Sequence, residues 1–334
     1  MIKDSFISKL ADYALMNACS VDSSGLYNGK AGISLALFET ARRLKNKHTE
    51  EQASNLLKEA LLSKMDDIGF ENGLAGIGYL LSYLITHRFI EADFEELFGD
   101  KHCKIETGIR ALSKQDNTYI LCKYLSIINY MHLLNEKMIS ADFSFFAEQI
   151  LERVGELLLM LFNKTDGNEY SKIDVINLFN SYLKAVYKYK HLIINKDLLK
   201  LYIDLYYKNK FISNFSVGHY LTLVGKASSS EKIISVGIDN KMQALQNIYP
   251  GALSLAERIN ILFLLRQDGI QYAQTINKLE QLFTSPTCEH SLETNILKSI
   301  QASNFIAGYQ SGIARFLIYC AAYKKPNKYE DILL

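Results

Sequence analysis

The sequence predicts an all-α protein built from helical hairpins, and three observations support this prediction. Only three prolines occur in the 334 residues, so nearly the whole chain is free to be helical. Sustained alternation of apolar and polar residues, which would indicate strands, is almost absent. A glycine-rich phrase that opens into an amphipathic stretch occurs at residues 25–33, returns at 70–78, and recurs in a looser form at 306–317. Such internal repetition is typical of stacked or closed repeat architectures.

The repeat has a definite length. Gly29 and Gly73 occupy the same place in the first two copies and lie 44 residues apart. That span accommodates two helices and two loops, so the chain has room for about seven helical hairpins. We therefore expect residues 1–334 to form a single domain.

Apolar residues recur at three-to-four spacing along most of the chain, as expected for amphipathic helices. In order, the expected helices cover residues 2–18, 29–44, 50–64, 73–86, 93–112, 118–136, 144–162, 173–189, 196–208, 220–225, 233–247, 254–267, 270–283, 292–302 and 313–323. Loops rich in Ser, Asp, Asn and Gly separate several of them. The repeat is clear at both ends of the chain and weaker between, where the glycines are missing.

Composition excludes several classes of function. The formal charge is +1, and lysines are spread among acidic residues, so no basic patch indicates binding to nucleic acid. No segment reaches the roughly 18 uninterrupted apolar residues of a membrane span, so no integral membrane segment is expected. The N-terminus is unlike a secretory signal, which predicts a cytoplasmic protein. The five cysteines are scattered and odd in number, so a disulfide framework is not expected.

The glycine turns are the first candidate site. Glycine at a helix start can allow a positive φ in the entering turn, and it can let two backbones approach closely. Helix N-termini also carry partial positive charge and free N–H groups that can hold an anion or a carboxylate. Tight helix packing explains the same glycines without any ligand. The residues predicted to line a cavity at these turns are Asn28, Gly29, Gly32, Asn72, Gly73, Gly76, Gly308 and Gly312.

The phrases at residues 26–33, 72–78 and 308–317 resemble the Gly-Leu-Ala-Gly-Ile repeat of the lanthionine synthetase C-like family, the cyclases of lanthipeptide biosynthesis. The resemblance implies an α/α toroid of about seven helical hairpins. It also implies a function: addition of a cysteine thiol of a ribosomally made precursor peptide to a dehydrated residue, which gives a thioether ring. In that family a zinc ion held by two Cys and one His activates the thiol, because zinc stabilises the thiolate near neutral pH. The implied partners are the precursor peptide and a dehydratase or another modifying enzyme.

The chain departs from the family at the zinc ligands. Residues 246–249, directly before Pro250 and Gly251, contain no cysteine, and no Cys-His dipeptide occurs anywhere in the sequence. The nearest pair of zinc-binding residue types is Cys288 and His290, whose spacing differs from that of the family. Three or more ligands are needed for a zinc site, so this pair alone is a weak signal.

The acid–base residues are displaced in a similar way. The catalytic aspartate of the family would fall near Tyr119, and the closest carboxylate is Asp116. The catalytic histidine would fall near Val217, and the closest imidazole is His219. We take Asp116 and His219 as the catalytic candidates that the resemblance implies.

Three functional hypotheses follow. In the first, the chain is a peptide-maturation protein of this family, and a shifted site built from His219, Cys288 and His290 retains zinc. In the second, which the missing cysteines favour, it is a zinc-free pseudoenzyme without a cofactor that serves as a peptide-binding or scaffold subunit of a modifying complex. The third is an α/α-barrel hydrolase, whose paired carboxylates would come from distant positions.

Overall fold

The computed structural model describes residues 3–136, 143–164, 172–189, 195–246, 255–268, 274–277, 279 and 312–322. Throughout these residues the regular structure is helical, and they contain no strand, which confirms the predicted all-α class. The helices are α1 (Asp4–Ala18), α2 (Lys30–Leu44), α3 (Lys47–Leu62), α4 (Leu74–Thr86), α5 (Phe94–Ser113), α6 (Thr118–Lys123), η1 (Leu125–Ile127), α7 (Ile128–Glu136), α8 (Phe143–Asn163), α9 (Lys172–Lys188), α10 (Lys196–Tyr207), α11 (Phe215–Ala227), α12 (Glu231–Gln246), α13 (Leu255–Asp268) and α16 (Ile313–Ala322).

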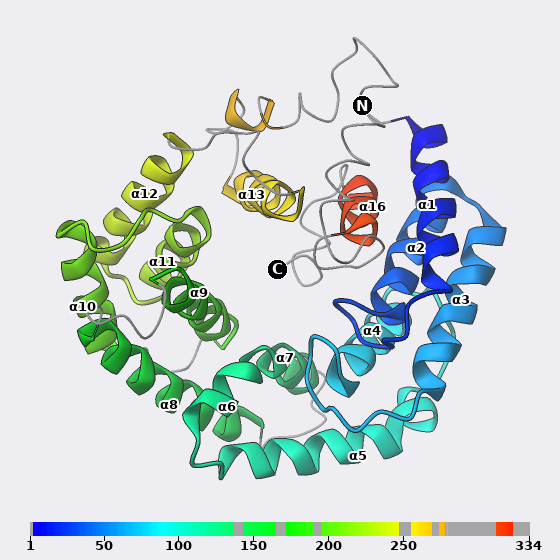
Figure 1. Cartoon of the computed structure of the whole chain (residues 1–334), viewed down its shortest axis with the longest axis horizontal. Coiled ribbons are helices and arrows are strands. Elements are labelled where there is room, and N and C mark those ends of the chain that lie inside the picture. Colours follow the sequence, from blue (N-terminus) through cyan, green and yellow to red (C-terminus); the bar gives the residue numbers. More distant parts are fainter. Residues whose placement is uncertain are drawn as a thin grey trace. The chain divides into compact units, whose positions relative to one another are not determined.

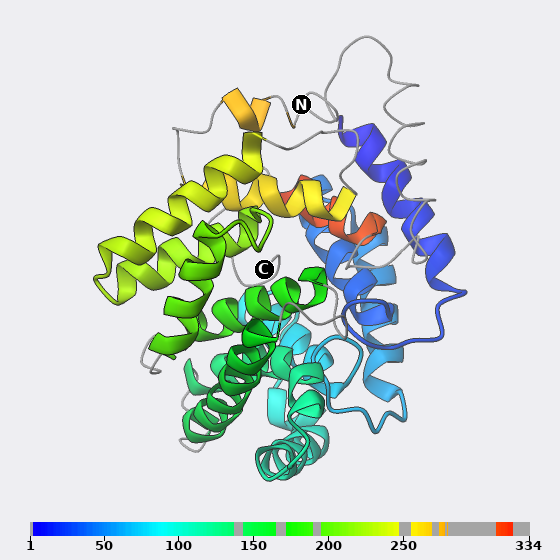
Figure 2. The same ribbon diagram turned by 60° about the vertical axis from the view of Figure 1, so that its left-hand side comes forward.

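The chain divides into two compact units, and the first combines residues from both ends of the sequence. It comprises residues 1–102 and 249–334. Within it, α2 packs against α1, α3, α4 and α16, and α13 packs against α16. Figures 1 and 2 both show α16, in red, beside the blue helices α1 and α2. The looser third copy of the glycine phrase therefore leads into a helix that packs directly on the helix of the first copy.

The second unit is continuous and comprises residues 103–248. Here α8 packs against α6, α7, α9 and α10, while α11 packs against α9 and α12. The α11–α12 hairpin is especially tight, since a Cβ added at Gly218 would lie 2.7 Å from both Gly237 O and Lys241 N. Glycine is required at such a crossing because the two backbones leave no room for a side chain.

Two kinds of helix alternate from α2 to α4. The helices that follow the glycine turns are buried nearly all round: residues 31–41 of α2 and 74–84 of α4 are all buried. A helix that is apolar on every side belongs in the interior. By contrast, α3 buries a single stripe at three-to-four spacing, formed by Thr49, Ala53, Leu56, Leu57 and Ala60. This alternation of interior and amphipathic helices is the expected signature of paired helices in two layers.

The helix expected over 118–136 is interrupted. Its α6 segment ends at Lys123, a 3₁₀ turn covers Leu125–Ile127, and α7 resumes at Ile128. Apolar periodicity continues through the break because Leu125, Ile127 and Ile128 are all buried, so the pattern alone did not reveal the change of helix type. Within the described residues no helix is both long and apolar enough to cross a membrane.

Candidate functional site

The first two glycine turns are built alike, hydrogen bond by hydrogen bond. At the first turn, Lys30 N donates to Ser23 O at 2.9 Å; at the second, Leu74 N donates to Asp67 O at 2.8 Å. Each donor and each acceptor is shifted by 44 residues from its counterpart. The predicted repeat length therefore describes equivalent backbone positions in three dimensions, and both turns present a helix N-terminus in the same way.

Close backbone approach, and not a positive φ, explains these glycines. Gly29 has φ −136° and Gly73 has φ −118°, which are extended values open to any residue. A Cβ at Gly73 would lie 2.5 Å from Asp67 O and 2.5 Å from Gly69 N, and a Cβ at Gly29 would approach the backbone of Gly25 equally closely. Of the two uses of glycine that the sequence suggested, the positive φ is wrong at these two positions.

The two turns also pack on one another. Tyr27 N donates to Glu71 O at 2.6 Å, and the rings of Tyr27 and Phe70 meet edge to face with centroids 6.3 Å apart. A Cβ at Gly25 would lie closer than 3.0 Å to the backbone of Asn72. The glycine phrase thus has a structural role: it lets the entry loops of neighbouring repeats lie backbone to backbone.

Polar side chains gather at this loop pair. Arg315, in the first turn of α16, is 7% exposed, and its Nη2 donates to Asn260 Oδ1 of α13. Burial, and to a smaller extent the Glu71 carboxylate, raise the pKa of Tyr27 to about 12, while the Arg315 guanidinium acts in the opposite direction. A phenol with such a pKa stays neutral at physiological pH and can donate a hydrogen bond. We call Tyr27, Glu71, Asn260 and Arg315 the turn cluster.

Asn28 adjoins the turn cluster and has an unused acceptor. Its Oδ1 is buried and has no hydrogen-bond partner in the described part of the chain. Buried amide oxygens are rarely left in this state, since an unmade hydrogen bond costs free energy. This atom is an acceptor to which an N–H donor could still bind. Asn72, its counterpart in the second repeat, is exposed.

The structure does not bring the two predicted catalytic residues together. His219 lies inside α11, is 1% exposed, and packs edge to face on Tyr220 with ring centroids 5.3 Å apart. Asp116 is exposed in the loop before α6, and its described contact is a backbone one, from Arg153 Nη2 to Asp116 O at 3.0 Å. The Asp116 carboxylate therefore does not orient the His219 ring, as a carboxylate partner of a general base would.

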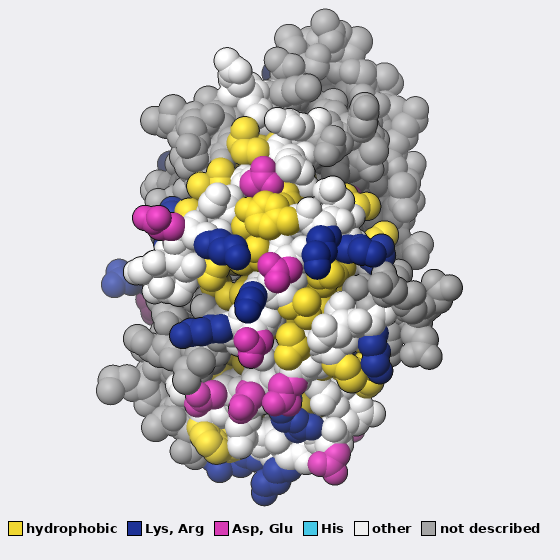
Figure 3. Space-filling view, turned by 90° about the vertical axis from the view of Figure 1, so that its left-hand side faces the viewer, with side chains coloured by type: hydrophobic (Ala, Val, Ile, Leu, Met, Phe, Trp, Pro, Cys, Tyr) yellow, Lys and Arg dark blue, Asp and Glu magenta, His cyan; other side chains and the backbone are white. Residues whose placement is uncertain are grey.

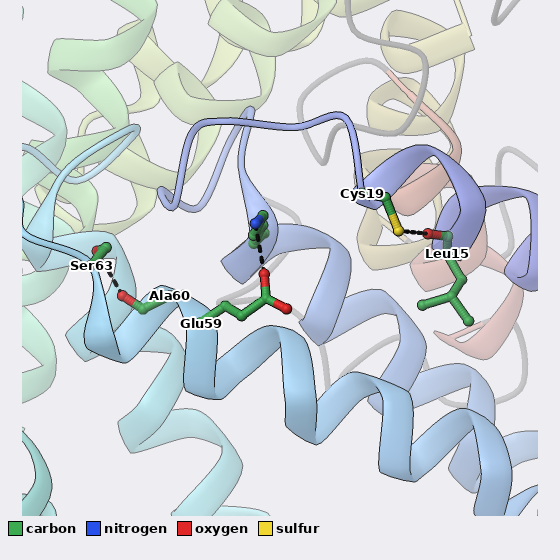
Figure 4. A network of polar contacts seen from close by, with 6 residues as sticks. Leu15, Cys19, Glu59, Ala60 and Ser63 are labelled. Atoms are coloured by element: carbon green, nitrogen blue, oxygen red, sulfur yellow. Dashed lines mark hydrogen bonds and ion pairs between the residues drawn. The ribbon is translucent and has the colours of Figure 1, made fainter.

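The described cysteines differ in how their surroundings affect the thiol. Burial raises the pKa of Cys320 to about 12 and that of Cys122 to about 11, whereas a zinc ligand must be deprotonated. Cys19 is exposed, and Figure 4 shows its sulfur directed back to Leu15 O of its own helix, 3.9 Å away. Among the residues that the structure describes, no group of three His, Cys, Asp or Glu side chains could hold a metal ion.

Several predicted site residues fall outside the described residues: Cys288, His290 and Gly308. Gly32, Gly76 and Gly312 are buried at the starts of α2, α4 and α16. A Cβ at Gly76 would lie closer than 3.0 Å to Phe70 O and at 2.8 Å from Leu26 Cβ. Sequence reasoning missed Tyr27, Glu71 and Arg315, although the 44-residue offset that relates Tyr27 to Glu71 was a usable signal.

The same region of α2 is tied to its neighbour by an ion pair. Lys30 Nζ lies 2.6 Å from Glu59 Oε2 of α3, and Figure 4 shows Glu59 extending from α3 toward the start of α2. The Lys30 side chain is 21% exposed and that of Glu59 is 54% exposed, so we expect the pair to stabilise the fold by less than about 1 kcal/mol. The pair links the start of α2 to α3.

Comparison with known proteins defines the fold. No family model and no curated protein sequence matches the chain. Among solved structures, one titled nisin cyclase matches with a TM-score of 0.62 at 12% identity, over 98% of this chain and 96% of that one. At this identity the likeness shows the fold alone, and it confirms the predicted α/α-toroid class.

Proposed function

We infer that the chain acts in the maturation of a ribosomally made peptide as a lanthionine synthetase C-like protein, and that its task is to bind the precursor peptide. The observation that carries this inference is the likeness to nisin cyclase over nearly the whole chain. The paired glycine turns, which share the 44-residue repeat, support the same assignment. We also propose that residues 1–334 act together as a single domain.

We further infer that the chain works without the zinc chemistry of the cyclases. The sequence lacks the cysteine before Pro250 and the Cys-His dipeptide, and the described thiols Cys122 and Cys320 have raised pKa values. A zinc ligand set needs two thiolates in that family, and only Cys288 is offered in the corresponding region. The proposal is therefore a zinc-free, peptide-binding pseudoenzyme.

The turn cluster supplies groups suited to holding a peptide. The guanidinium of Arg315 is one donor, and the neutral phenol of Tyr27 is a second donor to a carbonyl or carboxylate. The buried Oδ1 of Asn28 is an acceptor for a peptide N–H. None of these groups is a nucleophile or a general base near pH 7, so their chemistry is binding.

Two measurements on the purified full-length chain test the proposal. Metal analysis after gel filtration is expected to give far less than one equivalent of zinc. A tightly bound equivalent that disappears in Cys288→Ala would overturn the zinc-free reading and support a retained cyclase site.

The second measurement is a calorimetric titration that gives the affinity for a Ser/Thr/Cys-rich precursor peptide, encoded by a gene adjacent to that of this protein. Asn28→Ala is expected to weaken binding about fivefold, the loss of one net hydrogen bond. Asn163→Ala is the matched control, because this asparagine is exposed at the end of α8 and should leave affinity unchanged. Absence of binding to both the unmodified and the dehydrated peptide would refute the proposed function.

A further inference from the structure

A second polar site lies in the second unit, between α10 and α12. It is a depression of about 420 Å³ lined by Tyr206, Tyr207, Asn209, Ser235, Asp239 and Gln243. Ser235, Asp239 and Gln243 are spaced four residues apart on α12, so helical geometry places them on one face. Figure 3 shows the side of the molecule that carries α10 and α12, where hydrophobic side chains alternate with charges of both signs. We call this site the α10–α12 pocket.

Hydrogen bonds hold the carboxylate of this pocket in place. Tyr206 OH donates to Asp239 Oδ2 at 2.9 Å, and Gln243 Nε2 donates to the same oxygen at 3.0 Å. Ser213 Oγ donates to Gln243 Oε1 at 3.2 Å and so orients the amide. Both lone pairs of Oδ2 are occupied by these donors. Four side chains thus form a preorganised network around a single acidic group.

The other oxygen of Asp239 is open. Within the described residues Oδ1 accepts no hydrogen bond, and no Lys or Arg lies within ion-pair distance of the carboxylate. Lys208, which follows the pocket in sequence, is exposed. A half-buried carboxylate without a counter-ion is a site where a ligand cation gains more than it would in water.

Tyr207 lines the pocket, and two exposed aliphatic residues, Ile238 and Met242, are sequence neighbours of its lining residues on α12. The ring of Tyr207 is 60% exposed and lies 6.0 Å from the Tyr206 ring, measured between centroids. On the outer face of α12, Ile238 and Met242 are 45% and 43% exposed and four residues apart. An aromatic face beside a carboxylate suits an ammonium group, through cation–π attraction and a charged hydrogen bond together. The neighbouring aliphatic side chains suit the apolar residues that flank it.

We propose that the α10–α12 pocket binds a lysine side chain of a peptide, with the ammonium on Asp239 Oδ1, its methylene groups against Tyr207, and adjacent apolar residues against Ile238 and Met242. Lysine is preferred to arginine because a guanidinium pairs best with two carboxylate oxygens, and Oδ2 is already saturated. The pocket would give the precursor peptide an anchor on the second unit, in addition to the turn cluster of the first. In this respect the inference rests on the proposed function, although the pocket chemistry does not depend on it.

The test uses a synthetic pentapeptide, acetyl-Ala-Leu-Lys-Leu-Ala-amide, and analogues with arginine or norleucine in the centre. Titration of ¹³C-methyl-methionine-labelled protein gives the dissociation constant from the Met242 signal, which is assigned with Met242→Leu. The lysine peptide is expected to bind about tenfold more tightly than the norleucine peptide, as for one charge-assisted hydrogen bond, and more tightly than the arginine peptide. Raising the ionic strength from about 0.05 to about 0.3 M should weaken binding of the lysine peptide.

Asp239→Asn is expected to reduce the affinity for the lysine peptide about tenfold and to abolish its advantage over norleucine. Asp197→Asn is the matched control: it removes an exposed acid of α10 about 15 Å along the helix from Tyr207 and should have no effect. Tyr207→Leu keeps the pocket acidic and should reduce the lysine advantage to a smaller extent. Equal binding of the lysine and norleucine peptides would overturn the proposal, as would a Met242 signal that responds to a neutral sugar but not to the lysine peptide.

The experiment separates this proposal from the proposed function. If the precursor peptide binds and Asp239→Asn leaves its affinity unchanged, the lysine pocket is refuted and the proposed function stands. If the lysine peptide binds through Asp239 while no precursor peptide binds, the proposed function is refuted and the pocket stands.

Discussion

Substitution of alanine at Gly73 tests the account of the repeat turns. The φ of −118° is allowed for alanine, so the whole cost should be steric. Its Cβ would lie at 2.5, 2.5 and 2.6 Å from Asp67 O, Gly69 N and Gly69 O, which are backbone atoms that cannot rotate away. Overpacking costs about 1–3 kcal/mol when side chains can adjust, and alanine is also a poor N-cap, so we expect a loss of about 3–4 kcal/mol.

Thermal unfolding followed by circular dichroism measures this loss. At about 2–3 °C per kcal/mol for a chain of this size, Tm should fall by about 6–12 °C. Gly29→Ala should show a similar loss, because its surroundings are equivalent. Gly99→Ala in α5 is the control, since the nearest atom to its Cβ is the flexible Glu95 Oε2 at 3.3 Å. That change should be neutral or stabilising by up to about 1 kcal/mol, owing to helix propensity.

The same experiment can refute the reasoning. If Gly73→Asn is tolerated while Gly73→Ala is not, a Cβ fits at this position, the loss in alanine comes from the N-cap alone, and the close-approach account fails. A loss below about 1 kcal/mol at both Gly29 and Gly73 would show that the two loops can separate at little cost.

Three further predictions concern stability and pH. Arg42→Met should lower the free energy of unfolding, measured in urea, by about 2 kcal/mol, because Arg42 Nη2 lies 2.7 and 2.8 Å from the two carboxylate oxygens of Glu39, which is 1% exposed. This expected loss allows for solvent screening, since the Arg42 side chain is 34% exposed. An unchanged free energy of unfolding would contradict the prediction. Asn240→Ala should cost about 2–3 kcal/mol by the same measurement, since Asn240 is fully buried and its Nδ2 donates to Tyr202 OH at 2.7 Å; a loss under about 1 kcal/mol would show that water replaces it. The thiol of Cys320 has its pKa raised from 9.0 to about 12, so the folded state holds this proton more firmly than the unfolded state does; its contribution to stability is complete below pH 9 and is lost as pH rises toward 12. At pH 8, Ellman's reagent should therefore label the exposed thiols at once and Cys320 only after unfolding, and rapid labelling in the native state would contradict its burial.

The candidate site was only partly accessible from the sequence. The glycine turns at Gly29 and Gly73 were found because the repeat is written in local residue types, and the structure reproduces their 44-residue spacing. Asp116 and His219 were proposed from the resemblance, and the structure places one on the surface and the other inside α11. Sequence position near a family motif does not show where a side chain points. Whether Asp116 and His219 contact one another therefore could not be tested without the structure.

What the sequence determined by itself is the class of the protein: helices, their order, and a glycine turn at the start of two interior helices. These follow from hydrophobic periodicity and glycine placement, which act within about one helix length. The tertiary structure alone decided which polar groups meet. Packing brings the charges of Arg315 and Glu71 to act on Tyr27, and it sets Tyr206 against Asp239 across 33 residues of sequence. Contacts between distant residues depend on how helix faces pack. The residue pattern within one segment does not identify the segment that packs against it.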